Sequence, residues 1–152
     1  MFELLRARRG RKAAVAVITP QVDASRHRLA GIPDAIWLEP YVVGFITALI
    51  TLVARQAVGS LSGNAMGLVQ ADAWAEITGL DAGLIGEEIC LLSSMEDLEF
   101  AEGCRSASAF FAAHAAKAVS PDGGADLAAL WSALFDSRID KGLGERAWMH
   151  VP

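Results

Sequence analysis

Apolar residues recur along this chain at the spacing of α-helices. Over about residues 40–58 they cover every side of a helix, a pattern typical of a helix that neighbours surround. Elsewhere apolar residues lie three and four positions apart, which is the spacing of one helical face. The segments expected to be helical in this way are 20–30, 64–78, 81–92, 93–119 and 125–137. The sequence therefore predicts an all-α fold, a compact bundle of five to six helices around a central apolar helix at about 40–58.

Prolines and capping residues set the predicted helix boundaries. Pro20 and Pro40 stand where a helix can start, because the first helical position needs no backbone N–H donor. The serines at 93–94 precede the acidic pair at 96–97 by three residues each, a capping-box spacing that favours a helix start there. The short apolar run 13–18 fits either a helix or a short strand, because periodicity does not decide so brief a segment.

The apolar faces of the expected helices give a candidate core. In the helix over 64–78, one face carries Met66, Val69, Ala73, Trp74 and Ile77. In the helix over 81–92, the residues expected to point inward are Leu84, Ile85, Ile89 and Leu92. Two cysteines, Cys90 and Cys104, lie on different expected helices without a CxxC spacing, and we expect both to be reduced and buried.

The chain of 152 residues has the length of a single domain with one hydrophobic core. We expect that domain to span 13–137. The basic segment 1–12 is expected to be a surface or mobile arm, and 138–152 an irregular tail. The tail residues expected to dock on the core are Ile139, Leu143, Trp148 and Met149.

Charge is distributed unevenly along the chain, although the formal net charge is only -5. Residues 1–28 hold seven basic and two acidic side chains, whereas 81–102 hold seven acidic side chains and no lysine or arginine. An acidic surface repels phosphates, so we expect no nucleic acid as a partner. The basic arm could instead lie across the acidic segment of its own or a neighbouring subunit, or, in a less favoured interpretation, on anionic lipid headgroups.

A surplus of apolar side chains has to be buried somewhere. Mean hydropathy is +0.36 with only 20% charged residues, so a second subunit is the first candidate to cover that surplus. The uncharged stretch 41–54 is shorter than the roughly 20 residues that a membrane span needs. The apolar run 13–18 is too short for the core of a secretory signal. We therefore expect a cytoplasmic protein, a homodimer, without membrane contact.

A polar line interrupts the central helix. Thr47, Thr51 and Arg55 are four residues apart and share one side, with Gly44 and Ala48 beside them where another helix could approach closely. The simpler interpretation is that the threonine hydroxyls bond back to carbonyl groups one turn earlier. The alternative is a polar seam that lines a cavity or a dimer interface.

Residues that usually carry catalysis do not form a recognisable constellation. Glu87 and Glu88 share a helix with Cys90, but nothing has the spacing of metal ligands, so we expect no metal and no cofactor. The patterns GxSxG, GxGxxG and GxxxxGK are absent. His114 stands at the edge of the apolar face of its helix, as a half-buried structural histidine does.

These observations favour a non-enzymatic helical protein that acts through protein–protein interaction, as a homodimer. Its candidate contact residues are Arg6, Arg8, Arg9, Arg11, Lys12, Glu87 and Glu88. The alternative is a helical domain that binds or transforms a small apolar molecule in an interhelical pocket. The candidate polar groups of that pocket are Thr47, Thr51, Arg55 and His114.

Overall fold

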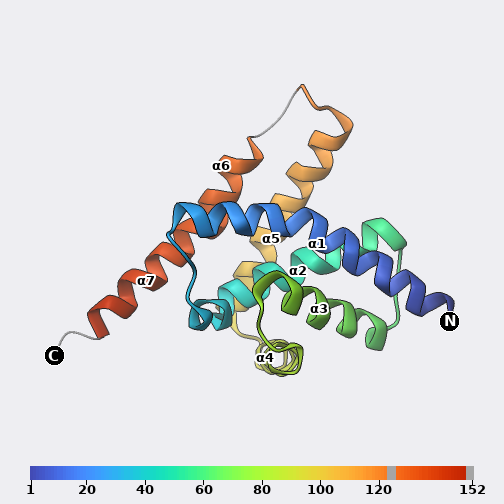
Figure 1. Ribbon diagram of the computed structural model, residues 1–152, viewed down its shortest axis with the longest axis horizontal. Coiled ribbons are helices and arrows are strands. Elements are labelled where there is room, and N and C mark those ends of the chain that lie inside the picture. Colours follow the sequence, from blue (N-terminus) through green and yellow to red (C-terminus); the bar gives the residue numbers. More distant parts are fainter. Residues whose placement is uncertain (123–125, 150–152) are drawn as a thin grey trace.

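The computed structural model describes residues 1–122 and 126–149, with side chains up to residue 145. These residues form helices joined by short turns, and no strand lies among them (Figure 1). In chain order the elements are α1 (Phe2–Arg28), η1 (Asp34–Leu38), α2 (Pro40–Val58), α3 (Gly63–Thr78), α4 (Ala82–Ser94), α5 (Leu98–Val119), α6 (Leu127–Trp131), η2 (Ser132–Asp136) and α7 (Ser137–Met149).

Helix α2 is the centre of the bundle and packs against α5, α1 and α3 (Figure 1). It begins at Pro40 and ends before Gly59, whose φ of 76° suits glycine. The predicted all-α bundle around 40–58 is confirmed. Within the described residues α2 alone is long and apolar enough to cross a membrane, and 61% of its most apolar window is buried among the other helices. Its apolar surface is thus largely covered by protein.

Helices α2 and α5 cross at two glycines. A methyl group added at Gly44 would overlap the carbonyl oxygen of Phe100, and one added at Gly103 would overlap that of Tyr41. The Cys104 thiol lies 3.5 Å from the carbonyl oxygen of Gly44 in the same crossing. The close approach expected beside Gly44 is therefore confirmed, and Gly103 is its partner on α5.

Aromatic rings fill the core where α2 meets the C-terminal helices. Trp131 lies 4.8 Å from Phe135, 5.1 Å from Phe110 and 5.2 Å from Phe45, between ring centroids. Its contacts with Phe45 and Phe110 are edge-to-face, a favourable geometry for aromatic pairs. The π-helical turn η2 contributes Phe135 to this cluster.

Helix α1 differs from the sequence prediction because it runs without a break through Pro20. A helix start at Pro20 is therefore wrong, and the run 13–18 is helical. The segment 1–12, expected as an arm, forms the first turns of α1. A proline costs a helix interior about 3 kcal/mol, which burial along one face of α1 offsets. The buried residues of that face are Ala7, Gly10, Ala14, Ile18, Val22 and Ser25.

The boundary between α4 and α5 also differs from the prediction. The serines at 93–94 end α4, and α5 starts at Leu98 with Asp97 as its cap, so the predicted capping box is wrong. The Asp97 carboxylate accepts a hydrogen bond of 2.9 Å from the backbone N–H of Phe100. Glu96 has a φ of 51°, a left-handed conformation that turns the chain between the two helices. Leu92 is buried as expected, and α4 continues past the predicted boundary to Ser94.

The C-terminal segment is helical, so the prediction of an irregular tail is wrong. Helix α7 continues the line of α6 and η2 to Met149 (Figure 1). Ile139 is fully buried and Leu143 packs against the core, as expected of docking residues. The side chains of Trp148 and Met149 lie outside the described residues. The face predicted for 64–78 is buried in α3, which confirms that prediction.

Candidate functional site

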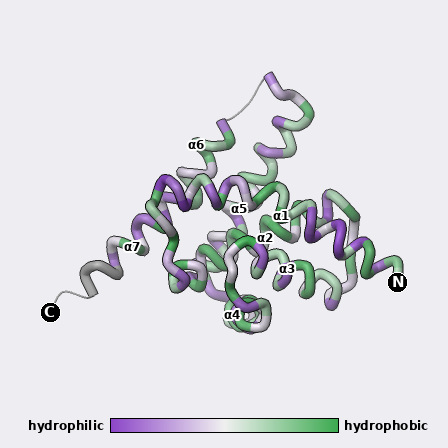
Figure 2. Tube along the Cα trace, viewed as in Figure 1, coloured by the Kyte–Doolittle hydropathy of each residue, from purple (hydrophilic) through white to green (hydrophobic). Residues whose placement is uncertain are grey.

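An open groove of about 900 Å³ lies between the first turns of α1 and helix α3. Its floor is apolar and includes Phe2, Leu5 and Leu68, which are 85%, 52% and 58% exposed. Its remaining lining is mostly basic, from Arg6, Arg8, Arg9, Arg11 and Lys12. Figure 2 shows this alternation of green and purple along the N-terminal half of α1.

Two side chains of α1 hold this end of the helix in place. The Arg6 guanidinium donates to the carbonyl oxygen of Val58 at 2.7 Å and to that of Ser60 at 2.6 Å, which caps the C-terminal end of α2. The Glu3 carboxylate accepts a hydrogen bond of 2.7 Å from the backbone N–H of Ser62, at the start of α3. That hydrogen bond lowers the pKa of Glu3 below its ordinary 4.5. Contacts within the chain therefore hold the first turns of α1 in place and shape the groove.

Most of the cations around the groove are free to contact a partner. Among the described residues, no hydrogen bond or ion pair engages the side chains of Arg8, Arg9 or Lys12, and all three are exposed. Arg11 lies 3.9 Å from Glu76, a weak pair at the surface. Asp72 is the acidic residue in the groove lining. The surface thus combines apolar side chains with an excess of unpaired positive charge.

A second exposed apolar surface lies on α4 and the turn after it. Leu84, Glu87 and Leu91 are spaced as one helical face and all are exposed. Leu98, at the start of α5, is 83% exposed. The prediction that Leu84 points inward is therefore wrong, whereas Ile85 is buried as expected.

Negative charge surrounds this second surface. In the part of the chain that the structure describes, no ion pair engages Glu87, Glu88, Glu96 or Glu99. Glu87, Glu96 and Glu99 are exposed and Glu88 is half-buried. Helix α3 packs on both α1 and α4, so the groove and the α4 surface both adjoin α3 (Figure 1).

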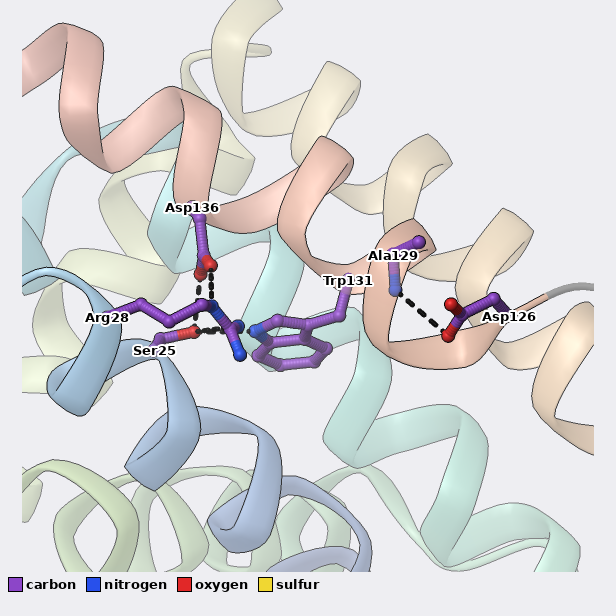
Figure 3. A network of polar contacts seen from close by, with 6 residues as sticks. All are labelled: Ser25, Arg28, Asp126, Ala129, Trp131 and Asp136. Carbon is purple, nitrogen blue, oxygen red and sulfur yellow. Dashed lines mark hydrogen bonds and ion pairs between the residues drawn. The ribbon is translucent and has the colours of Figure 1, made fainter.

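A buried polar network ties α1 to the C-terminal helices (Figure 3). Ser25 donates to the Asp136 carboxylate and accepts from the Trp131 indole N–H at 2.8 Å. Arg28 donates to the other oxygen of Asp136 at 2.6 Å. Ser25 is fully buried and Asp136 is 6% exposed, so the network stabilises the fold and has no opening to a substrate. Asp126, also drawn in Figure 3, caps α6 through the backbone N–H groups of Ala128 and Ala129.

The polar line of the central helix packs against α3. Thr51 donates to the carbonyl oxygen of Thr47 at 2.9 Å, the simpler of the two interpretations, and accepts from the Gln70 amide at 2.9 Å. The Thr47 hydroxyl is buried and makes no hydrogen bond to any described residue, so the simpler interpretation is confirmed for Thr51 and wrong for Thr47. Arg55 is exposed.

His114 lies on α5, half-buried, and stacks on Phe110 with ring centroids 6.3 Å apart. The structure does not gather it with the polar line of α2 around a common cavity. None of these four pocket candidates lines the groove or either of two further cavities, of about 70 and 440 Å³, among the described residues.

The cysteines and carboxylates do not converge. Cys90 is exposed, so its predicted burial is wrong, and Cys104 is half-buried. Burial raises the pKa of the Cys104 thiol. Within the described residues no group of three or more histidine, cysteine or acidic side chains is placed to hold a metal ion. Glu87 and Glu88 instead belong to the acidic surface of α4.

Sequence reasoning identified the charged residues of both surfaces but missed their apolar residues. Leu68 and Leu91 were not candidates, because a single apolar residue on a predicted helix does not reveal which side of the helix packs. Phe2 was not a candidate because residues 1–12 were expected to form an arm and not a helix. The spacing Leu84, Glu87, Leu91 is the sequence signal that marks the acidic face as amphipathic. No family model, curated protein or solved structure matches the chain.

Proposed function

We propose that this chain is a soluble, cytoplasmic, non-enzymatic protein that acts through protein–protein interaction, as a homodimer. One observation carries the proposal: large apolar side chains stay exposed in two regions of an otherwise well-packed bundle. Of the exposed large apolar residues described, only Val119 lies away from these regions. The others are Met1, Phe2, Leu4, Leu5 and Leu68 around the groove, and Leu84, Leu91, Met95 and Leu98 around α4.

The energetic scale supports association. Full burial of one large apolar side chain contributes about 1.5–3 kcal/mol. Losing translational and rotational freedom on association costs about 4–15 kcal/mol. Covering several of these side chains together is therefore of the size that a specific contact needs, and contiguous exposed apolar patches commonly mark such contacts.

Sedimentation velocity over a range of protein concentrations tests the proposal. We expect a reversible monomer–dimer equilibrium at micromolar concentrations. A single monomeric species throughout that range would contradict the proposal. Native mass spectrometry of the same sample reports any small molecule that stays bound. A monomer carrying a retained apolar molecule would favour the alternative, a helical domain that binds a small ligand.

A further inference from the structure

We infer that the dimer contact joins the two unlike surfaces: the α1/α3 groove of one copy binds α4 and the following turn of a second copy. This inference rests on the proposed function and names the partner of the groove. The occupant is a second copy of this chain because the chain itself carries a surface with the opposite charge on an amphipathic helix.

Charge is the first argument. The groove presents Arg8, Arg9 and Lys12, and the α4 surface presents Glu87 and Glu96, all exposed and without an ion pair in the part of the chain described. Opposite potentials favour contact between unlike surfaces and select against wrong pairings. Groove against groove, or α4 against α4, would instead place like charges together.

Shape and hydrophobicity are the second argument. A helix binds a groove through apolar residues on one face, spaced three, four and seven positions apart. Leu84 and Leu91 on α4 have this spacing and are 41% and 52% exposed. The groove offers Phe2 and Leu68 to receive them. The 13 residues of α4 form a helix of about 20 Å, long enough to present both leucines to one groove.

The placement of the surfaces is the third argument. Because both surfaces adjoin the same helix, α3, a twofold axis beside α3 would let each groove bind α4 of the other copy. Such a pair is closed and buries four apolar surfaces at once. A membrane or a small amphiphilic anion would fill the groove but would leave the acidic surface of α4 uncovered.

Charge reversal on each surface tests the inference. In the variant R8E/R9E the groove loses its excess of positive charge, and in E87K/E96K the α4 surface loses its excess of negative charge. We expect each variant alone to dimerise at least tenfold more weakly than the unaltered chain in sedimentation velocity. We expect an equal mixture of the two to form a heterodimer, because the unaltered groove of one copy then meets the unaltered α4 surface of the other, and the new glutamates meet the new lysines. Lys117→Glu, on the exposed last turn of α5, is the matched control and should dimerise like the unaltered chain.

The outcomes separate this inference from the proposed function. If the unaltered chain dimerises and both charge-reversed variants dimerise equally well, the contact lies elsewhere and only this inference falls. If the unaltered chain is a monomer, both fall. Co-sedimentation of that monomer with vesicles containing phosphatidylserine, lost in R8E/R9E, would assign the groove to a membrane and overturn the self-contact. Circular dichroism of each variant confirms that the reversal leaves the helices intact.

Discussion

At the residue scale, the fold depends on small side chains where helices meet. Gly44 and Gly103 let α2 and α5 approach until backbone atoms touch, and Gly10 lies against Ala54 where α1 crosses α2. Packed interiors tolerate little added volume, because neighbouring atoms have nowhere to move. Glycine is therefore required at these positions by the close contact between helices rather than by backbone conformation.

Substituting Gly103 with alanine should destabilise the protein by about 2–4 kcal/mol, because the new methyl group overlaps the backbone of α2 at Tyr41. The matched control is Gly67→Ala on α3, where a methyl group meets no atom within 4 Å. Alanine there should stabilise the helix by about 0.5–1 kcal/mol. Urea unfolding of both variants measures the difference. If Gly103→Ala loses no stability, or gains stability while Gly67→Ala loses it, then α2 and α5 are further apart than in this structure.

Ser25 is a second residue on which buried contacts depend. Ser25→Ala removes the hydrogen bonds that satisfy the Trp131 indole and one oxygen of Asp136, leaving both polar groups without that partner. We expect a loss of about 1–3 kcal/mol in the free energy of unfolding. The control, Ser108→Ala, removes only an exposed bond to a carbonyl group of its own helix and should be close to neutral. If chemical denaturation gives the same loss in the free energy of unfolding for both substitutions, the buried network is contradicted.

At the element scale, helix ends are satisfied by side chains from distant helices. Arg6 caps the end of α2, and Glu3 binds the chain at the start of α3. Local side chains cap other helix starts: Asp81 for α4, Asp97 for α5 and Asp126 for α6. The first turn of α1 therefore organises the connection between two other helices.

The lowered pKa of Glu3 gives this arrangement a pH dependence. Because the folded chain holds the carboxylate below its ordinary pKa of 4.5, the stabilisation is present above that value and is lost as pH falls through the folded pKa. Thermal unfolding should show Glu3→Gln less stable than the unaltered chain at neutral pH, with the gap narrowing in acid. Glu145→Gln, at an exposed position of α7, is the control. A gap that is independent of pH would mean that Glu3 does not bind Ser62 as a carboxylate.

Sequence patterns predicted the elements where one signal dominated. The all-round apolar pattern of α2, its start at Pro40 and the buried face of α3 all stand in the structure. Where two signals competed, local reasoning failed. Pro20 indicated a helix start, but packing of α1 along its length outweighed the proline. The serines at 93–94 and Asp97 are all good caps, and the left-handed turn at Glu96 places Asp97 at the start of α5.

Only the charged residues of the candidate site were predictable from the sequence. Arg8, Arg9 and Glu87 were identified from charge runs, which depend on sequence alone. The exposure of Leu84 was not predictable, since α4 carries apolar residues on both sides and only the position of α3 decides which side is covered. The close crossing at Gly44 was foreseeable on α2, but its partner Gly103 depends on the angle between two helices distant in sequence.

At the scale of the whole molecule, a buried central helix leaves two outer surfaces incompletely covered. Helix α2 is enclosed by α1, α3 and α5, whereas the start of α1 and the outer face of α4 carry apolar side chains in water. The two surfaces differ in the sign of their unpaired charges. The bundle is therefore well packed inside but exposes apolar side chains in two regions, which the proposed association of two copies would cover.

Hydrogen exchange followed by mass spectrometry at low and high protein concentration tests both the enclosed central helix and the contact between unlike surfaces. Amides of α2 should exchange slowest at both concentrations, because the other helices enclose them. Raising the concentration should slow exchange in peptides covering 2–12, 63–72 and 84–98 and leave the second half of α5 unchanged. Fast exchange across α2, or slowing confined to other segments, would contradict both the enclosed central helix and the contact between unlike surfaces.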